Sequence, residues 1–249
     1  FDSILNQKHT DVFLYVGVDG PVGDDLVLCL REYESLENVH IYWFLENRGL
    51  AIVLNDLLDI CFKEGYEYIA RMDADDICLS NRFEKQIIYM NNHKNIDICG
   101  GHIEEMDENK KSIGVIRYPL SHDEMKCFFG KRNPLAHMSV IFRKSYFHKA
   151  GLYPVDTDKD EDTIFWLNGF LSGCKFANID EVLVRVRVNK DFYLRRNGLS
   201  KSLSDLKNRC LVIRKLNLSY VNYIFACARF VIFIIPIPHV TQFAYKFLR

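Results

Sequence analysis

Residues 66–76 read YEYIARMDADD, and the order of residues in this stretch decides the fold. Tyr66–Met72 is rich in apolar and aromatic residues, which predicts a buried β-strand. Three acidic side chains follow directly, at Asp73, Asp75 and Asp76. The stretch therefore predicts a strand that carries an acidic cluster at its carboxyl end.

Predicted strands and helices alternate around this stretch. The predicted strands are Asp11–Val18, Val39–Leu45, Tyr66–Met72 and Ile96–Cys99. The predicted helices, from the spacing of apolar residues, are Asp24–Leu36, Leu50–Phe62 and Asn81–Asn91. This alternation is typical of an α/β fold in which helices flank a mostly parallel sheet. Ligands of such sheets bind beyond the carboxyl ends of the strands, so we expect Asp19 and the acidic cluster on the same rim.

The second half of the chain is less regular. Strands are predicted at Met138–Arg143 and Cys174–Val188, a helix at Asp162–Leu171, and a helical pattern from Leu203 onward. We expect one α/β domain over residues 1–200, followed by a basic and apolar helical extension over residues 201–249.

Charge is distributed unevenly along the chain, although the net charge is only −1. Residues 185–249 carry 13 lysines and arginines but only two acidic residues, whereas residues 1–184 carry 19 basic and 31 acidic side chains. The basic end suits phosphates, anionic lipid or nucleic acid. The acidic body argues against a general nucleic-acid binder, so we expect no nucleic-acid partner.

The eight cysteines are scattered and include no Cys-x-x-Cys pair. This pattern favours free thiols in a reducing compartment over a disulfide framework or a zinc site. Phe1–Gln7 does not resemble a secretory leader. We therefore expect a cytoplasmic protein.

The acidic cluster has two interpretations. Carboxylates that lie close together repel each other, and a divalent cation removes that repulsion. Mg²⁺ and Mn²⁺ prefer carboxylate and phosphate oxygens, and such an ion stabilises the charge that grows on a leaving phosphate. The alternative is that Asp75 or Asp76 caps the helix that follows while the other carboxylates are solvated. The pattern alone gives the two interpretations equal weight.

Three further groups are candidates for chemistry. Glu161 and Asp162 lie at the start of a predicted helix, where a carboxylate is able to take a proton from an acceptor hydroxyl. The alternative, which the pattern alone favours, is that these residues belong to a solvated acidic loop with a helix cap. Arg195 and Arg196 form either a diphosphate clamp or a solvated basic pair. His137, between two apolar stretches, is by itself more typical of a structural histidine than of a catalyst.

Several short motifs follow one another along the chain. They are Asn47-Arg48-Gly49-Leu50 with Asn55, Arg71-Met72-Asp73-Ala74-Asp75-Asp76, Arg82-Phe83 with Gln86, Asn133-Pro134 with His137, Glu161-Asp162 with Trp166, and the basic residues Arg185, Arg187, Arg195 and Arg196. Together they resemble the motifs of the bacterial family-2 glycosyltransferases of capsule and O-antigen synthesis. Each motif is weak alone, but the ordered set is specific and covers nearly the whole chain.

The resemblance implies a GT-A fold and an inverting, single-displacement transfer of a sugar from a nucleotide diphosphate donor, with a UDP-sugar expected. It also implies a role for each matching residue. On the donor side, Asp19 would recognise the nucleotide base, and Arg48 and Arg71 would line the nucleotide pocket. Asp73 would hold the ribose or share the metal, and Asp75 would bind Mn²⁺ or Mg²⁺. Asp162 would be the catalytic base, with Glu161 as the second candidate, and His137 would lie near the acceptor.

The sequence departs from the family pattern in two places. Members usually open with a strand that ends in a Val-Tyr-Asn-type motif, whereas Phe1–Gln7 matches the helix after that strand. The resemblance therefore implies that the first strand is missing from this sequence. Many members also have Tyr-Asp after Glu-Asp, where this chain has Thr163-Ile164, which leaves fewer candidate bases.

The stretch Tyr220–Pro238 is strongly apolar. A membrane span needs about 20 mostly apolar residues without a central charge, but Arg229 interrupts this stretch and Pro236 and Pro238 end it. We expect an interfacial helix whose basic neighbours meet anionic lipid; a helix packed on the core is the alternative. An interfacial helix fits the glycan or polyprenyl-diphosphate-linked acceptor that the resemblance implies, at the inner face of the cell membrane.

Two other function classes remain open from the sequence. A nucleotidyltransferase would share the sheet and the acidic metal site, but it would also need an early glycine-rich phosphate loop with a nearby lysine, which the sequence lacks. A non-catalytic scaffold attached to the membrane would use the acidic cluster only as a helix cap.

Overall fold

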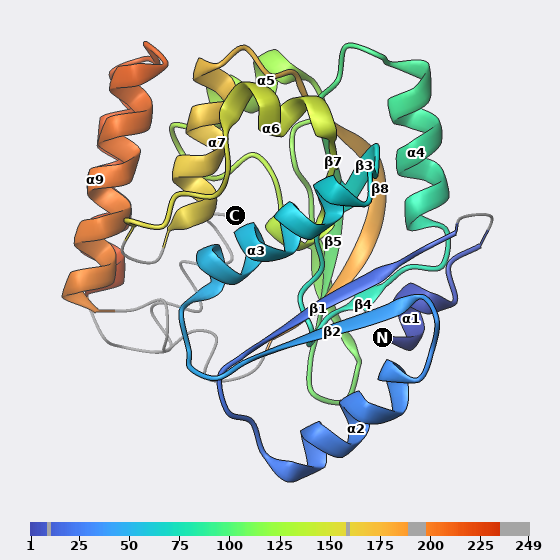
Figure 1. Ribbon diagram of the computed structural model, residues 1–249. Helices are drawn as coiled ribbons and strands as arrows, with labels where there is room; N and C mark the ends of the chain where they lie inside the picture. Colours follow the sequence, from blue (N-terminus) through green and yellow to red (C-terminus); the bar gives the residue numbers. More distant parts are fainter. Residues whose placement is uncertain (9–10, 158–159, 189–197, 235–249) are drawn as a thin grey trace.

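The structure is a computed structural model that describes residues 1–8, 11–157, 160–188 and 198–234 (Figure 1). A short helix, α1 (Asp2–Leu5), precedes a parallel pair of strands, β1 (Leu14–Asp19) and β2 (Val39–Phe44). Helix α2 (Asp24–Glu34) connects the two strands, and α3 (Leu50–Lys63) follows the second. The predicted strand, helix, strand and helix of this region are confirmed, with ends that differ by a few residues.

A glycine shapes the carboxyl end of β1. Gly20 has a φ of +95°, and a Cβ atom built at this position would lie 2.8 Å from the backbone nitrogen of Asn47. Only glycine adopts this backbone without strain, and a side chain would also push the turn after β2 away. Gly20 therefore lets the carboxyl end of β1 approach the turn that follows β2.

The second sheet has six strands in the order β3-β7-β5-β8-β4, with β6 paired to β5. The strands are β3 (Tyr68–Ala70), β4 (Ile77–Cys78), β5 (Ile98–Met106), β6 (Ser112–Ile116), β7 (Ile141–Arg143) and β8 (Phe176–Arg187). Only β5 and β8 pair in parallel, whereas β3 with β7, β7 with β5, β5 with β6 and β8 with β4 are antiparallel.

The prediction of a mostly parallel sheet is wrong for this sheet, which is mixed. Parallel neighbours need a crossover connection, usually a helix, while antiparallel neighbours do not. Beyond β5 the chain turns back at once into β6, and β7 runs between β3 and β5 in the opposite direction to both. The regular alternation in the first hundred residues therefore does not extend to the second half.

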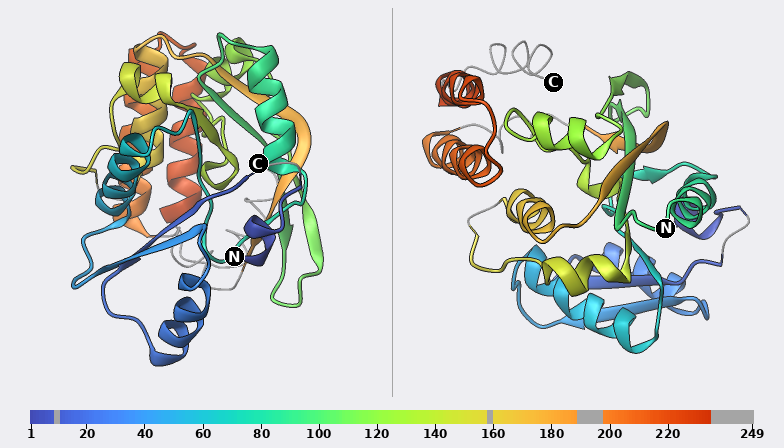
Figure 2. Two further views of the ribbon diagram at one scale, coloured as in Figure 1. Left: turned by 45° about the vertical axis from the view of Figure 1, so that its right-hand side comes forward. Right: turned by 90° about the horizontal axis from the view of Figure 1, so that it is seen from above.

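Helices cover both faces of the six-stranded sheet (Figure 2). Helix α4 (Arg82–Asn92) lies on one face, and α5 (His122–Phe128), α6 (Lys144–Ala150) and α7 (Glu161–Leu171) lie on the other. Two further helices, α9 (Leu199–Lys215) and α10 (Val221–Ile234), pack on each other as an outer layer, and α9 contacts α7. Among the described residues, no helix is long and apolar enough to cross a membrane. Pro236 and Pro238 lie outside the described residues.

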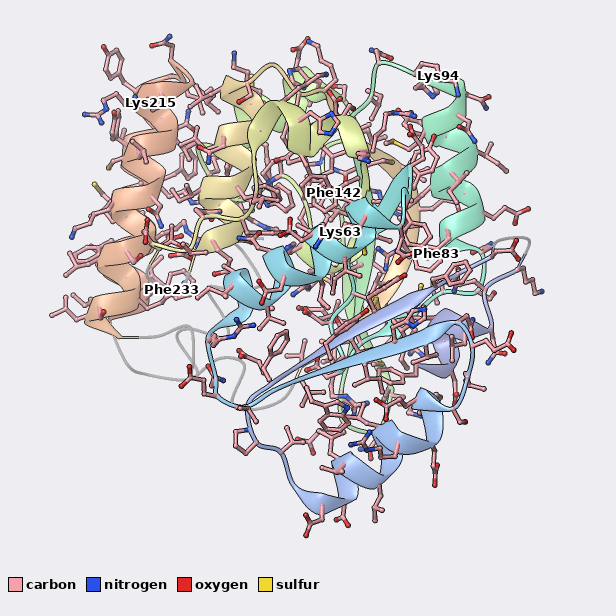
Figure 3. The ribbon with its side chains drawn as sticks, in the orientation of Figure 1. Lys63, Phe83, Lys94, Phe142, Lys215 and Phe233 are labelled. Atoms are coloured by element: carbon pink, nitrogen blue, oxygen red, sulfur yellow. The ribbon has the colours of Figure 1, made fainter. Side chains whose placement is uncertain are left out.

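A cluster of aromatic side chains holds α7 against the sheet. Trp166, Phe142, Phe165 and Tyr146 are each less than 2% exposed. Figure 3 shows Phe142 in the interior behind α3, and its ring lies 5.9 Å from that of Trp166, centroid to centroid. Each buried aromatic side chain of this kind contributes several kcal/mol, on the order of 3–5 when it is truncated to alanine. The first turn of α7 is therefore fixed by dense packing directly behind it.

Candidate active site

A cavity of about 380 Å³ opens beside the first turn of α7. Its walls come from the residues after β3, from the loop between α5 and β7, from the first turn of α7, and from α9 and α10. Five of the residues predicted from sequence line it, namely Arg71, Asp73, His137, Glu161 and Asp162. The fold thus brings Asp73 of the predicted metal cluster and the predicted base, Asp162, to one cavity, although nearly ninety residues of chain separate them; the predicted metal ligand Asp75 does not line it.

The acidic cluster lies directly after β3. Asp73, Asp75 and Asp76 each offer a carboxylate oxygen within 4.8 Å of the others. One oxygen of Asp76 accepts a hydrogen bond from the backbone N–H of Arg187 at 3.0 Å, and its other oxygen is buried without a hydrogen-bond partner. Burial is the main cause that raises the pKa of Asp76 to about 7, and the charges of Asp73 and Asp75 add to it. A cation close to this carboxylate would favour its ionised form.

The helix-cap interpretation of this cluster is wrong. Helix α4 begins at Arg82 with Asn81 in the capping position, and strand β4 lies between the cluster and the helix. Asp76 instead binds the backbone of β8. Three close carboxylate oxygens, one of them buried and unsatisfied, are the ligand set that suits Mg²⁺ or Mn²⁺.

Buried polar side chains hold the end of β3 in place. Arg82 is fully buried and donates to the backbone carbonyls of Arg71 at 3.0 Å and Val140 at 3.1 Å. Gln86 accepts from Arg82 at 3.0 Å and donates to the carbonyls of Cys99 and Ser139. The Arg82 and Gln86 motif residues are therefore structural: they fix the strand from which the acidic cluster projects.

Arg71 links the cluster to the cavity. Its guanidinium forms an ion pair with Asp73 and is 9% exposed. A second guanidinium nitrogen, Nη1, is buried without a hydrogen-bond partner. Because a buried donor without a partner is costly, this nitrogen is ready to bind an anionic group in the cavity.

The predicted base is held by its neighbours. Oδ2 of Asp162 accepts a hydrogen bond from the Asn133 side-chain amide at 2.9 Å, and Oδ1 accepts from the backbone N–H of Thr163 at 2.7 Å. Glu161 also lines the cavity, and burial, followed by the charges of Asp162 and Asp160, raises the pKa of Glu161 above its usual value. Asp162 thus has a defined orientation, and the neighbouring Glu161 is a carboxylate with a raised pKa.

The Asn133 side chain connects α7 to α9. Its Oδ1 accepts from Arg209 at 2.7 Å and from the Thr163 hydroxyl at 3.1 Å, while its amide nitrogen donates to Asp162. Arg209 is 4% exposed, donates to the Phe129 carbonyl at 3.0 Å and lies 3.5 Å from Asp205. Sequence analysis noted Asn133 only as part of a motif and did not identify Arg209. The one signal for Arg209 was a basic residue among the apolar positions of the last helical pattern.

His137 lines the cavity as a satisfied, neutral side chain. Its Nε2 shares a hydrogen bond of 2.8 Å with the Tyr153 hydroxyl, and its ring meets that of Trp166 edge to face. Burial, with a smaller contribution from the charge of Arg71, holds the pKa of His137 well below its usual value. His137 therefore combines a structural contact with a position beside the predicted base.

Asp19 and Arg48 lie together but do not line this cavity. The two carboxylate oxygens of Asp19 accept from the backbone N–H groups of Arg48 at 2.7 Å and Gly49 at 2.9 Å. Arg48 forms an ion pair with Asp56 and lies 4.2 Å over the ring of Phe44. Asp19 thus shapes the turn between β2 and α3. Arg195 and Arg196 lie outside the described residues.

Comparison with known proteins identifies the family of the chain. Residues 1–151 match the family model described as glycosyl transferase family 2. The chain belongs to glycosyl transferase family 2.

Two relatives of the chain are named as glycosyltransferases. The amylovoran biosynthesis glycosyltransferase AmsE of Erwinia amylovora is 36% identical over 189 residues, which cover 76% of this chain and 69% of that protein. A UDP-Gal:alpha-D-GlcNAc-diphosphoundecaprenol beta-1,3-galactosyltransferase of Escherichia coli is 29% identical over 83% of this chain and 74% of that protein.

A solved structure of a more distant protein shows the same fold. It is the mannosyltransferase PcManGT from Pyrobaculum calidifontis in complex with GDP-Man and Mn²⁺. The TM-score is 0.60 at 13% sequence identity, and the match covers 92% of this chain and 68% of that chain. The fold of this family 2 glycosyltransferase is therefore GT-A-like, with a mixed sheet and flanking helices.

Proposed function

We propose that this family 2 glycosyltransferase transfers a sugar from a UDP-sugar to a lipid-linked or glycan acceptor, with inversion at the anomeric carbon, in surface polysaccharide synthesis. The observation that carries the proposal is the single cavity that Asp73 and Asp162 share. An acidic metal-ligand set at one wall and a fixed carboxylate at another are the two parts that direct glycosyl transfer requires.

The acidic wall is the proposed donor side. Asp73 and Asp75, with Asp76 as a third carboxylate, would hold Mn²⁺ or Mg²⁺, and the bound ion would supply positive charge for the donor diphosphate. The Nη1 atom of Arg71, which has no hydrogen-bond partner, would donate a charge-assisted hydrogen bond to the same diphosphate. Asp19 and Arg48, with Arg195 and Arg196, are proposed for the nucleotide. The printed donor of the Escherichia coli relative, UDP-Gal, supports uridine as the nucleoside.

The wall formed by α7 is the proposed acceptor side. Asp162 takes the proton of the acceptor hydroxyl while the hydroxyl oxygen attacks the anomeric carbon. The bond from that carbon to the donor phosphate breaks, and its electron pair leaves with the nucleoside diphosphate. One displacement from the opposite face inverts the configuration. The hydrogen bonds from Asn133 and Thr163 support Asp162 as the base because they hold its carboxylate in one orientation. Glu161 stays the second candidate, and His137 lies where the acceptor would enter.

The outer helices are the proposed membrane-facing part. Tyr220, which directly precedes α10, is 86% exposed, and Ile224 within α10 is 70% exposed. Val221 and Val231 of α10 are also exposed. Arg214 and Lys215 are exposed at the end of α9, where Figure 3 labels Lys215. Apolar side chains next to cations suit an anionic lipid surface. We propose that α9 and α10, which fall almost entirely in the predicted extension over residues 201–249, keep the protein peripheral to the inner face of the cell membrane, in the cytoplasm.

Calorimetry of UDP binding tests the proposal. UDP is titrated into the protein with Mn²⁺ and again with a chelator, with GDP as the control nucleotide. We expect UDP to bind in Mn²⁺ only, and Asp75→Asn to weaken this binding by at least about 100-fold, since a metal contributes several kcal/mol to such a site. Equal affinity with the chelator, or an unchanged affinity in Asp75→Asn, would reject the acidic cluster as the donor site.

A further inference from the structure

The cavity contains five basic side chains, and Arg132 differs from the other four among the described residues. Arg71 pairs with Asp73, Lys201 with Asp160, and both Arg209 and Arg229 with Asp205. Arg132 forms no ion pair within the described ranges, and its Nη1 is buried without a hydrogen-bond partner. A buried N–H donor without a hydrogen-bond partner is costly, so Nη1 of this half-buried arginine is arranged for a partner that comes with a ligand.

Two aromatic rings hold the Arg132 guanidinium in place. It lies 5.0 Å from the ring centre of Tyr118 and 5.8 Å from that of Phe128. The backbone N–H of Arg132 also donates to the Phe128 carbonyl at 3.1 Å. A guanidinium that packs against rings keeps its donors in one plane, which suits two oxygens of one phosphate group. Arg132 is thus oriented before any ligand binds.

The position of Arg132 assigns it to the acceptor side of the cavity. It precedes Asn133, whose amide holds Asp162 at 2.9 Å. The proposed donor side has its own anion-binding groups, namely the divalent metal that the acidic cluster would hold and the Arg71 guanidinium. Arg132 lines the cavity that Asp162 also lines, and it lies on the segment that holds the base, which is the acceptor side of the proposed function.

We propose that Arg132 binds the phosphate or diphosphate group of the acceptor, one sugar away from the hydroxyl that Asp162 deprotonates. The inference rests on the proposed function for the identity of the acceptor side, but the anion site itself does not depend on turnover. It makes the enzyme selective for acceptors that are glycosyl phosphates or diphosphates over neutral glycosides of the same sugar.

Binding of a short alkyl diphosphate, measured by calorimetry with a chelator present, tests the site directly. We expect Arg132→Gln to weaken this binding by about 10-fold to 100-fold and Arg132→Lys to weaken it less, because a charge-assisted hydrogen bond is lost or only displaced. Asp75→Asn leaves it unchanged. The matched control is Lys131→Gln, which removes the neighbouring exposed cation and keeps wild-type affinity. Absence of binding to the wild-type protein, or equal binding to Arg132→Gln, overturns the proposal.

Kinetics with two acceptors of the same sugar, one an alkyl diphosphate and one a neutral alkyl glycoside, separate the acceptor from the donor. We expect Arg132→Gln to raise KM about 10-fold or more for the diphosphate acceptor only, with the UDP affinity in Mn²⁺ unchanged. Equal effects on both acceptors would mean a structural role, and a lower UDP affinity would move Arg132 to the donor side. Failure of UDP to bind the wild-type protein would reject the donor site. The binding of the alkyl diphosphate would still decide, independently, whether Arg132 forms an anion site.

Discussion

The donor and acceptor sides of the cavity are built in different ways. On the donor side, Asp73, Asp75 and Asp76 are neighbours in sequence and project from the end of one strand. On the acceptor side, Asp162 depends on Asn133, and Asn133 depends on Arg209, which lies 76 residues further along the chain. The donor side is thus a local motif on a rigid strand, whereas the acceptor side is assembled from three distant segments. We expect variants on one side to leave the other side intact.

The largest separation is expected for Asp162→Asn. Loss of the base should lower kcat by about 100-fold to 10,000-fold, while the affinity for UDP in Mn²⁺ changes less than about twofold. Steady-state kinetics and calorimetry on the same preparation measure both values. Glu161→Gln is the matched control, with a smaller fall in kcat. A larger fall in Glu161→Gln than in Asp162→Asn would transfer the role of base to Glu161.

Asn133→Ala should sharpen the comparison, because it removes a positioning residue and no reacting group. We expect kcat to fall by about 10-fold to 100-fold through a misplaced carboxylate, with the UDP affinity retained. The unfolding free energy should fall by about 1–3 kcal/mol, since Arg209 and Thr163 lose a buried acceptor. The Asn133→Ser variant, which restores an acceptor oxygen for Arg209, should recover stability more than turnover. Equal recovery of both would make the role of Asn133 purely structural.

Gly20→Ala is the corresponding change at the donor side. Its φ of +95° and the 2.8 Å approach to Asn47 make alanine unfavourable by about 1–2 kcal/mol or more, measured by denaturant unfolding. Gly20 follows Asp19 and packs against the turn after β2, which carries Arg48. We therefore expect a lower UDP affinity. Turnover at saturating UDP-sugar should be close to wild type. The comparison would fail if kcat fell while the UDP affinity stayed the same.

The smallest effect concerns the pH dependence of stability. The pKa of His137 lies well below its usual value of 6.5, so the folded state stays neutral where the unfolded chain takes up a proton. The unfolded state then binds more protons, and the unfolding free energy decreases by about 1.4 kcal/mol for each pH unit below 6.5. Stability from this group is complete above pH 6.5. His137→Gln should reduce this pH dependence by the uptake of one proton on unfolding. Burial also lowers the pKa of His122, so a smaller pH dependence should remain in the variant. Denaturant titrations at pH 5.5 and pH 7.5 compare the two proteins, and identical slopes would show that His137 is charged in the fold.

The sequence was most informative where function depends on neighbouring residues. The strand and acidic cluster of residues 66–76, the helix that starts at Glu161, and the family were all predictable from local pattern and motif order. Two interpretations failed for a common reason. Local pattern does not record which strand lies next to which, so it missed the antiparallel pairs of the mixed sheet, and it left a helix cap open as the alternative for a carboxylate that binds the backbone of β8.

By itself, the sequence determined the chemistry that is available: carboxylates at a strand end, carboxylates at a helix start, and a basic C-terminal segment. Only the tertiary structure decided which of these groups share a cavity, which are held by partners, and which remain unsatisfied. Arg132 and Arg209 illustrate the difference. Both are arginines near apolar residues in the sequence, yet Arg209 pairs with Asp205 and donates to Asn133 and Phe129, while Arg132 forms no ion pair among the described residues. The cost of burying charge depends on neighbours that are distant in the chain, and folding alone brings those neighbours together.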